Sequence, residues 1–148
     1  MNFAMKYLPA FICLVFITGC RINVKDFNDN YYPCTFYAGT YTGGDSEGIY
    51  TFQLMEDGNI QSTGLKARVD NPSFLTLSKD GKYLLAISEM SSKDNEGSVV
   101  SYVIKEDSLA FVNRTTSGGA HPCFVAVNSD GYVLTANYNN RLSVTLLT

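Results

Sequence analysis

The sequence predicts an all-β fold made of successive β-propeller blades, fewer than are needed to close a ring. The body of the chain is rich in Tyr, Phe, Val, Ile, Thr and Gly, which favour strands and the turns between them. One part of the chain also matches a later part without a gap, which is typical of stacked supersecondary units. We therefore expect antiparallel four-stranded sheets that pack face to face.

The clearest signal is this internal repeat. Residues 71–86 align with residues 121–136, and both copies share an X-Pro start, a phenylalanine and an Asp-Gly pair. An earlier match at the same spacing of fifty positions joins residues 52–57 to residues 102–107. A four-stranded sheet that repeats at about this length and packs on its neighbours is a propeller blade.

The strands can be assigned in order along the chain. A first blade without its innermost strand is expected at residues 35–41, 48–55 and 59–68. A complete central blade follows at residues 73–78, 83–88, 97–105 and 109–115. Its first hairpin turns at Asp80-Gly81, because glycine accepts a positive φ without steric cost. Residues 122–147 supply the first three strands of a third blade.

This count has a consequence for assembly. Fewer than three blades are predicted, whereas a closed propeller has about 4–8. A blade buries both of its faces only between two neighbours, so we expect either a truncated copy or assembly with further blades.

The first residues have the features of an export signal. Lys6 precedes an apolar run at residues 8–17, which is too short to span a bilayer comfortably. The run ends in Ile17-Thr18-Gly19-Cys20, which resembles a bacterial lipobox. The resemblance implies a signal peptide at residues 1–19, a lipid on Cys20 and a membrane-anchored lipoprotein of the bacterial cell envelope. The alternative is an ordinary signal peptide with an incidental cysteine.

The rest of the sequence argues against some classes of ligand and partner. Residues 20–33 are polar and lack periodicity, so they are interpreted as a tether before a partial propeller at residues 34–148. The net charge of -3 and the scattered basic residues argue against nucleic acid. With one histidine in the chain, no zinc site is expected, and no cofactor is predicted. Cys34 and Cys123 either form a disulfide or, as we favour, remain two buried free thiols.

Blade geometry brings five polar residues to one rim. Strands alternate in direction, so the start of the first strand and the end of the second strand lie on the same side of a blade. The residues at these positions are Asn71, Glu89, His121, Asn137 and Tyr138. Because the first strand is innermost, we expect this rim to surround the mouth of a channel, where polar groups that converge form a ligand site.

The motifs along residues 35–148 resemble the lactonase family of seven-bladed propellers, which includes bacterial 6-phosphogluconolactonases and fungal muconate-lactonising enzymes. The matching elements are Tyr37-Ala-Gly-Thr-Tyr-Thr, Gly48-Ile-Tyr, Asn71-Pro-Ser-Phe, Glu89, Gly97-Ser-Val, Ser117-Gly-Gly-Ala-His-Pro-Cys and Ala136-Asn-Tyr. The resemblance implies hydrolysis or formation of the lactone ring of a sugar acid. The chain departs from the family in lacking its later blades and in carrying a lipoprotein signal, whereas 6-phosphogluconolactone is a cytoplasmic metabolite.

Lactone hydrolysis assigns a role to each rim residue. It needs a base that activates water and donors that hold the developing oxyanion. Histidine is the residue type suited to a base near neutral pH, which makes His121 the candidate base. Glu89 either orients His121 or is itself the base. Asn71, Asn137 and Tyr138 are the candidate substrate-binding residues.

Each of these residues also has a structural interpretation. His121 precedes Pro122, and an X-Pro pair often starts a strand in extended geometry. Glu89 opens a charged loop and would then be a solvated carboxylate. Asn71 and Asn137 would serve turns or caps, and Tyr138 would serve packing.

Three hypotheses follow from the sequence. The first is a lactonase-family hydrolase of a sugar-acid lactone, with His121 and Glu89 as catalytic residues. The second is a surface-anchored binding propeller without catalysis, because propellers carry many unrelated functions. The third is an inactive truncated product. A lactone assay of the protein with and without His121→Ala separates the first two.

Overall fold

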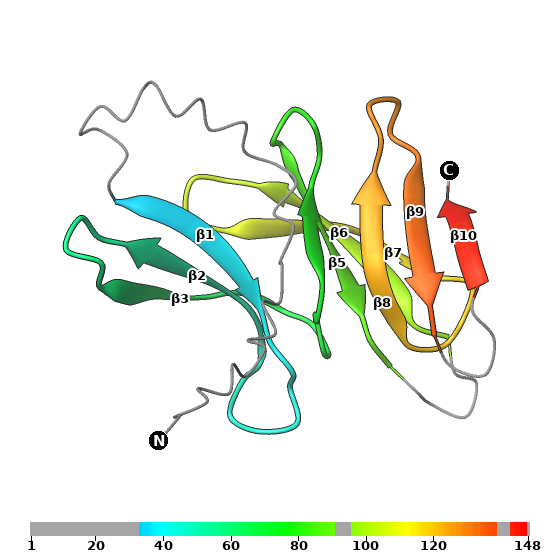
Figure 1. The fold of residues 1–148 in the computed structure, drawn as a ribbon, viewed down its shortest axis with the longest axis horizontal. Helices are drawn as coiled ribbons and strands as arrows, with labels where there is room; N and C mark the ends of the chain where they lie inside the picture. Colours follow the sequence, from blue (N-terminus) through cyan, green and yellow to red (C-terminus); the bar gives the residue numbers. More distant parts are fainter. Residues whose placement is uncertain (1–32, 91–95, 139–142, 148) are drawn as a thin grey trace, which may run out of the picture. The chain divides into compact units, whose positions relative to one another are not determined.

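A computed structural model describes residues 33–90, 96–138 and 143–147 of the 148-residue chain, and these residues belong to one compact unit. They form ten strands in three antiparallel sheets, as the sequence predicts (Figure 1). This described part contains no helix with the length and hydropathy needed to cross a membrane. The predicted signal peptide at residues 1–19, Cys20 and nearly all of the tether lie outside the described residues.

The first sheet contains three strands in the order β1-β2-β3. Their bounds are β1 (Cys34–Gly39), β2 (Gly48–Leu54) and β3 (Ile60–Arg68). Phe36 pairs with Phe52 across β1 and β2, and the two rings stack with centroids 5.8 Å apart. These strands match the predicted second, third and fourth strands of the first blade within two residues at each end.

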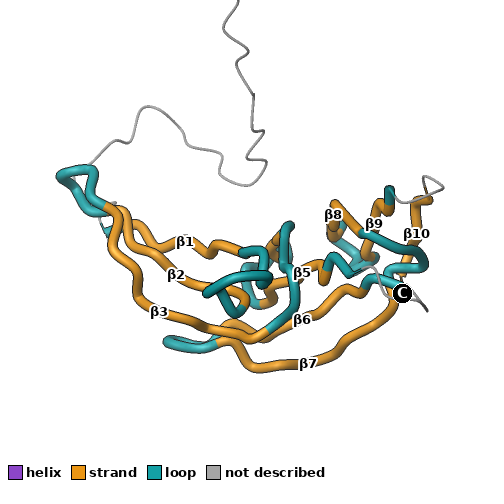
Figure 2. Tube along the Cα trace, turned by 90° about the horizontal axis from the view of Figure 1, so that it is seen from below, coloured by secondary structure: helices purple, strands orange, loops and turns teal. Residues whose placement is uncertain are grey.

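The second sheet is the complete blade, with four strands in the order β4-β5-β6-β7. Their bounds are β4 (Leu75–Leu77), β5 (Tyr83–Ser88), β6 (Ser98–Ile104) and β7 (Leu109–Thr116). The innermost strand is shorter than predicted, because the chain before it turns at Asn71, where the N–H of Ser73 bonds to the carbonyl of Asn71 at 2.8 Å. Figure 2 shows β5, β6 and β7 side by side in chain order.

The third sheet supplies the three strands that the sequence predicts for the last blade. It contains β8 (Pro122–Val127), β9 (Val133–Asn137) and β10 (Ser143–Leu147), with β9 in the middle. Both first hairpins turn at their Asp-Gly pair, where Gly81 has a φ of 70° and Gly131 a φ of 89°. β8 contacts both β4 and β5, so the inner strands of neighbouring sheets pack against each other.

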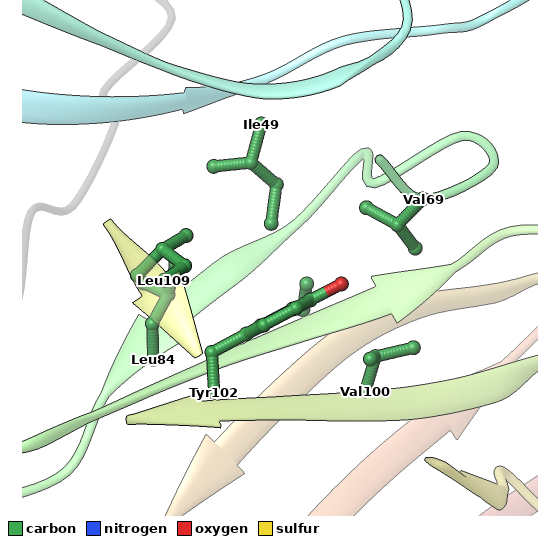
Figure 3. Close-up of a cluster of buried hydrophobic side chains, with 7 residues drawn as sticks. Ile49, Val69, Leu84, Val100, Tyr102 and Leu109 are labelled. Carbon is green, nitrogen blue, oxygen red and sulfur yellow. The ribbon is translucent and has the colours of Figure 1, made fainter. Parts of the chain in front are cut away.

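Two apolar clusters join the sheets. One combines residues of the first and second sheets, and Figure 3 shows its side chains between the strands. It consists of Ile49, Val69, Leu84, Ala86, Val100, Tyr102 and Leu109. The other lies where β8 packs on the second sheet and consists of Leu85, Ile87, Val99 and Val125. Successive residues of β5 thus alternate between the two clusters, which explains its continuous apolar run.

The two described cysteines are free, but they are exposed, so the expectation of buried thiols is wrong. Cys34 is the first residue of β1, where the strand begins. Cys123 lies at a register irregularity between Pro122 and Phe124, which turns its side chain out of the alternating pattern of β8.

Candidate functional site

Hydroxyl groups surround the carboxylate of Glu89, which directly follows β5. Oε2 of Glu89 accepts hydrogen bonds from the phenol of Tyr41, at 3.0 Å, and from the hydroxyl of Ser73. Oε1 accepts a hydrogen bond from the phenol of Tyr138 at 2.8 Å. Nδ1 of His121 lies 4.0 Å from the same Oε1. We call these five residues the Glu89 cluster.

The Glu89 cluster is assembled from all three sheets. Tyr41 follows β1 of the first sheet, and Ser73 and Glu89 flank β4 and β5 of the second. His121 precedes β8 and Tyr138 follows β9 in the third sheet. The predicted convergence of strand starts and strand ends therefore brings Glu89, His121 and Tyr138 together.

His121 and Asn71 share an unusual backbone conformation. Both precede a buried proline, and their φ angles are 50° and 45°, in the left-handed region. His121 is therefore not the extended residue that its X-Pro pair suggested. Each carbonyl accepts the N–H of the residue that follows the second strand of its own sheet, Tyr138 at 3.2 Å and Glu89 at 3.0 Å. The two turns are therefore equivalent, and they hold His121 next to the end of β9.

The imidazole of His121 is oriented by contacts on two sides. Its ring packs against that of Tyr138, with centroids 5.4 Å apart and planes inclined by 39°. Glu89 faces its Nδ1, and the backbone N–H of His121 bonds to the carbonyl of Met90 at 3.3 Å. The side chain of His121 is 24% exposed, whereas that of Glu89 is only 9% exposed. The imidazole is thus the more accessible member of the pair.

Asn71 joins the first two sheets through its side chain. Its Oδ1 accepts the backbone N–H of Thr42 at 2.9 Å and the hydroxyl of Thr42 at 3.1 Å. Its Nδ2 donates to the carbonyl of Glu89 at 3.2 Å. The amide thus holds the backbone of Glu89, the residue whose carboxylate lies at the centre of the cluster.

Asn137, the residue before Tyr138 of the Glu89 cluster, is buried. It is 1% exposed, and its Nδ2 donates to the carbonyl of Ser117 at 3.1 Å. The hydroxyl of Thr135 donates to the same carbonyl at 3.0 Å. A substrate-binding role for Asn137 stays a prediction, and the buried amide would need to be uncovered before it could meet a substrate.

The hydrogen bonds of the cluster determine the charge of Glu89. Burial alone would raise the pKa of Glu89, but the hydrogen bonds from Ser73, Tyr138 and Tyr41 and the nearby His121 outweigh it and lower this pKa. The hydrogen bond to Glu89 in turn raises the pKa of Tyr138. The site therefore holds an ionised carboxylate that accepts three hydroxyl donors.

The residues of the Glu89 cluster are suited to proton transfer. Within the described residues, no group of three or more His, Cys, Asp or Glu side chains could hold a metal ion. Among the described residues, neither Lys nor Arg forms an ion pair with Glu89. An imidazole beside a fixed anion can take a proton from water, because the anion stabilises the imidazolium that forms.

Tyr41 and Ser73 belong to the site, but they were not among the candidates predicted from the sequence. The repeat contained a signal for Tyr41, because it follows β1 as Glu89 follows β5. A search at a constant spacing of fifty misses this signal, because the loop lengths differ and β1 and β5 do not lie fifty positions apart.

The whole propeller part of the chain matches a known family. Residues 35–147 match the family described as "Lactonase, 7-bladed beta-propeller". The chain is 38% identical over 108 residues to the 6-phosphogluconolactonase of Bacillus subtilis. This alignment covers 70% of the chain and 30% of the relative.

Solved structures agree with this match. The periplasmic gluconolactonase of Pseudomonas aeruginosa superposes with a TM-score of 0.68 at 30% identity, over 75% of this chain and 33% of that protein. A proposed 6-phosphogluconolactonase from Bacteroides uniformis superposes with a TM-score of 0.65 at 36% identity, over 77% of this chain and 33% of that protein. The chain thus spans about a third of the length of these relatives.

Proposed function

Because the chain belongs to the lactonase family of seven-bladed β-propellers, we propose that the protein hydrolyses the ring ester of a sugar-acid lactone. The observation that carries this proposal is the Glu89 cluster, in which an ionised carboxylate faces the partly exposed imidazole of His121. The names of the Bacillus and Pseudomonas relatives, a 6-phosphogluconolactonase and a gluconolactonase, support the substrate class.

In the proposed reaction His121 is the general base. Its imidazole takes a proton from a water molecule, and the oxygen of that water bonds to the carbonyl carbon of the lactone. The bond between this carbon and the ring oxygen then breaks. The ring oxygen leaves with the proton from the imidazolium, and the product is the open hydroxy acid. Lactone and water are consumed one to one, without any oxidant or reductant.

Glu89 is proposed as the anion that supports His121, rather than as the base. A carboxylate with three hydroxyl donors and a lowered pKa is a weak base. The same negative charge stabilises the imidazolium, at an Nδ1–Oε1 distance of 4.0 Å that a small movement of either side chain would shorten to a hydrogen bond. This arrangement favours the orienting role over the alternative that Glu89 takes the proton itself.

Tyr138 is proposed to bind substrate as an acceptor. A phenol has one proton, and that of Tyr138 is donated to Glu89. Its oxygen keeps lone pairs for a hydroxyl of the sugar acid, and the side chain is exposed. Asn71 is proposed to contribute by fixing the backbone around Glu89, because both ends of its amide are engaged by protein groups. Direct contact between Asn71 and substrate would require one of these bonds to open.

We also propose that the protein acts at the cell envelope through a lipid on Cys20. The lipobox-like sequence supports this location, as does the name of the periplasmic relative from Pseudomonas aeruginosa. Cys20→Ser is expected to prevent incorporation of a labelled fatty acid and to release the protein from the membrane fraction. Unchanged labelling of the variant would exclude Cys20 as the lipid site.

The enzyme hypothesis is tested best with His121→Asn. Asparagine tolerates the left-handed region, and Asn71 occupies the equivalent turn one sheet earlier. The variant should therefore keep the fold while it loses the imidazole. The natural protein, at its full length, is assayed on glucono-δ-lactone and 6-phosphogluconolactone, with urea denaturation as the check on folding.

Three outcomes are informative. A loss of kcat/KM by about 100-fold or more, at an unchanged urea midpoint, supports His121 as the base. Undiminished turnover by His121→Asn would remove that assignment. If the wild-type protein hydrolysed neither lactone, yet bound one of them, the second hypothesis of a binding propeller without catalysis would replace the enzyme.

A further inference from the structure

We propose that Tyr41 and Ser73 are positioning residues, which fix the Glu89 carboxylate so that one defined oxygen faces His121. The inference rests on the proposed lactone hydrolysis and assigns two further residues to it. Neither residue needs to touch the substrate for this role, because both act through Glu89.

The argument begins with the two oxygens of the carboxylate. Tyr41 and Ser73 both donate to Oε2, whereas Tyr138 donates to Oε1 and His121 faces Oε1. A carboxylate with a single donor can rotate about its last bond. The two donors on Oε2, together with Tyr138 on Oε1, fix the plane of the group and leave Oε1 on the side of the imidazole.

The donors come from different sheets, which makes the arrangement rigid. Tyr41 lies after β1 of the first sheet, and Ser73 lies before β4 of the second. Ser73 is held by its backbone N–H, which bonds to the carbonyl of Asn71 at 2.8 Å. The carboxylate thus bridges the first two sheets, whose strands β1 and β4 are in contact.

The equivalence of the sheets explains how Tyr41 reaches this position. Gly39 pairs with Ile49 on the neighbouring strand, and Ile87 pairs with Val99 at the equivalent place of the next sheet. The residues two positions after Gly39 and Ile87 are Tyr41 and Glu89. Tyr138 holds the corresponding place in the third sheet, because its N–H bonds to His121 as that of Glu89 bonds to Asn71.

Three successive blades therefore direct toward one point the side chain that follows the second strand of the blade, which is β1 in the incomplete first blade. The central side chain is the carboxylate, and both neighbours are phenols that donate to it. Only His121, Tyr41 and Tyr138 among the titratable groups of the described residues have contacts with Glu89. Removing one hydroxyl donor should thus change the titration of Glu89 in a direction that can be stated.

The change expected in the pKa of Glu89 is an increase. A hydrogen bond to a carboxylate stabilises its ionised form, so the loss of a donor raises the pKa of Glu89. Tyr41 is 64% exposed, and Tyr41→Phe keeps the ring in place, so the fold should be unaffected. We expect an increase of about 0.5 to 1 pH unit for Tyr41→Phe and a similar one for Ser73→Ala.

The test is a carbon-13 NMR titration of the Glu89 carboxyl in the natural protein at full length. The resonance is assigned by its absence from Glu89→Gln. Tyr83→Phe is the matched control, because Tyr83 begins β5 at the end opposite Glu89 and is also exposed. Ser73→Thr keeps a hydroxyl and is expected to retain the wild-type titration, which a purely steric role of Ser73 would not require.

Kinetics separate this inference from the function on which it rests. Tyr41→Phe is expected to lower kcat on a lactone by about 3- to 10-fold at unchanged KM, because it alters the catalytic pair and no substrate contact. Titration midpoints in Tyr41→Phe and Ser73→Ala that coincide with the wild type would overturn the positioning role. A wild-type protein inactive on every lactone would overturn the proposed function, while the titration would still decide the positioning role.

Discussion

Gly97 is the position where one added methyl group is predicted to disturb both the fold and the site. A Cβ at Gly97 would overlap the ring of Pro122 and lie 3.1 Å from the carbonyl oxygen of Ser88. Pro122 is fully buried and cannot move aside. The backbone of Gly97 is also fixed, since its N–H bonds to Gly119 at 2.8 Å and its carbonyl accepts the N–H of Ser117 at 2.9 Å.

The expected cost of Gly97→Ala follows from this geometry. Burying a methyl group would gain about 0.8 kcal/mol, but overpacking against a fixed neighbour costs typically about 1–3 kcal/mol, sometimes more. Because Pro122 and the backbone of Gly97 are both fixed, we expect Gly97→Ala to lower the free energy of unfolding by about 3 kcal/mol. Pro122 directly follows His121, so kcat/KM on a lactone should also fall, by about 10-fold or more.

Urea denaturation measures this cost, and Gly43→Ala is the matched control. A Cβ at Gly43 would meet nothing within 4 Å, and neither glycine has a left-handed φ, so only the methyl group at position 97 meets a steric contact and neither variant adds backbone strain. The midpoint should fall for Gly97→Ala at an unchanged m-value and stay constant for Gly43→Ala. Equal midpoints for the two variants would refute the view that the contact between Gly97 and Pro122 holds β8 and His121 in place.

Two further predictions concern stability. Glu89→Gln should lower the free energy of unfolding by about 2 kcal/mol at pH 7, because three donors lose a charged acceptor. The lowered pKa of Glu89 means that its contribution is present above the unfolded-state pKa and is lost as the pH falls through the folded-state pKa. Denaturation curves of wild type and variant should therefore converge in acid, and a constant gap would contradict the assignment. Ile87→Ala should cost about 2–5 kcal/mol, since Ile87 is fully buried, whereas Leu77→Ala, at 49% exposure, should cost well under 1 kcal/mol in the same assay.

Much of the fold could be predicted because the repeat aligned the same physical signals twice. The apolar run at residues 83–88 predicted β5 to the residue, and the two Asp-Gly pairs located both first hairpins. The innermost strand β4 was predicted too long. Its start depends on the left-handed turn at Asn71, which side-chain bonds to Thr42 hold in place. A contact between segments 29 residues apart has no local signature in the sequence.

The site could be predicted only in part, because the hairpin turns differ by one residue. The N–H of Ser78 bonds to the carbonyl of Tyr83 in the second sheet, whereas that of Asn128 bonds to Tyr132 in the third. The turn in the third sheet is therefore one residue shorter than the turn in the second sheet. Tyr138 thus takes the place that a constant spacing of fifty would give to residue 139. Turn length depends on local hydrogen bonding, which the repeat does not encode.

The different exposure of Asn137 and Tyr138 follows from the pleat of a strand. Adjacent residues of a strand point to opposite faces, so these two side chains leave the end of β9 in different directions. Asn137 ends β9 and is buried, as Ser88 is at the end of β5. The next residue in each sheet, Tyr138 or Glu89, turns toward His121. Alternation therefore selects Glu89 and Tyr138 at the ends of β5 and β9, and the pairing of Gly39 with Ile49 puts Tyr41 at the place after β1 that Glu89 has after β5.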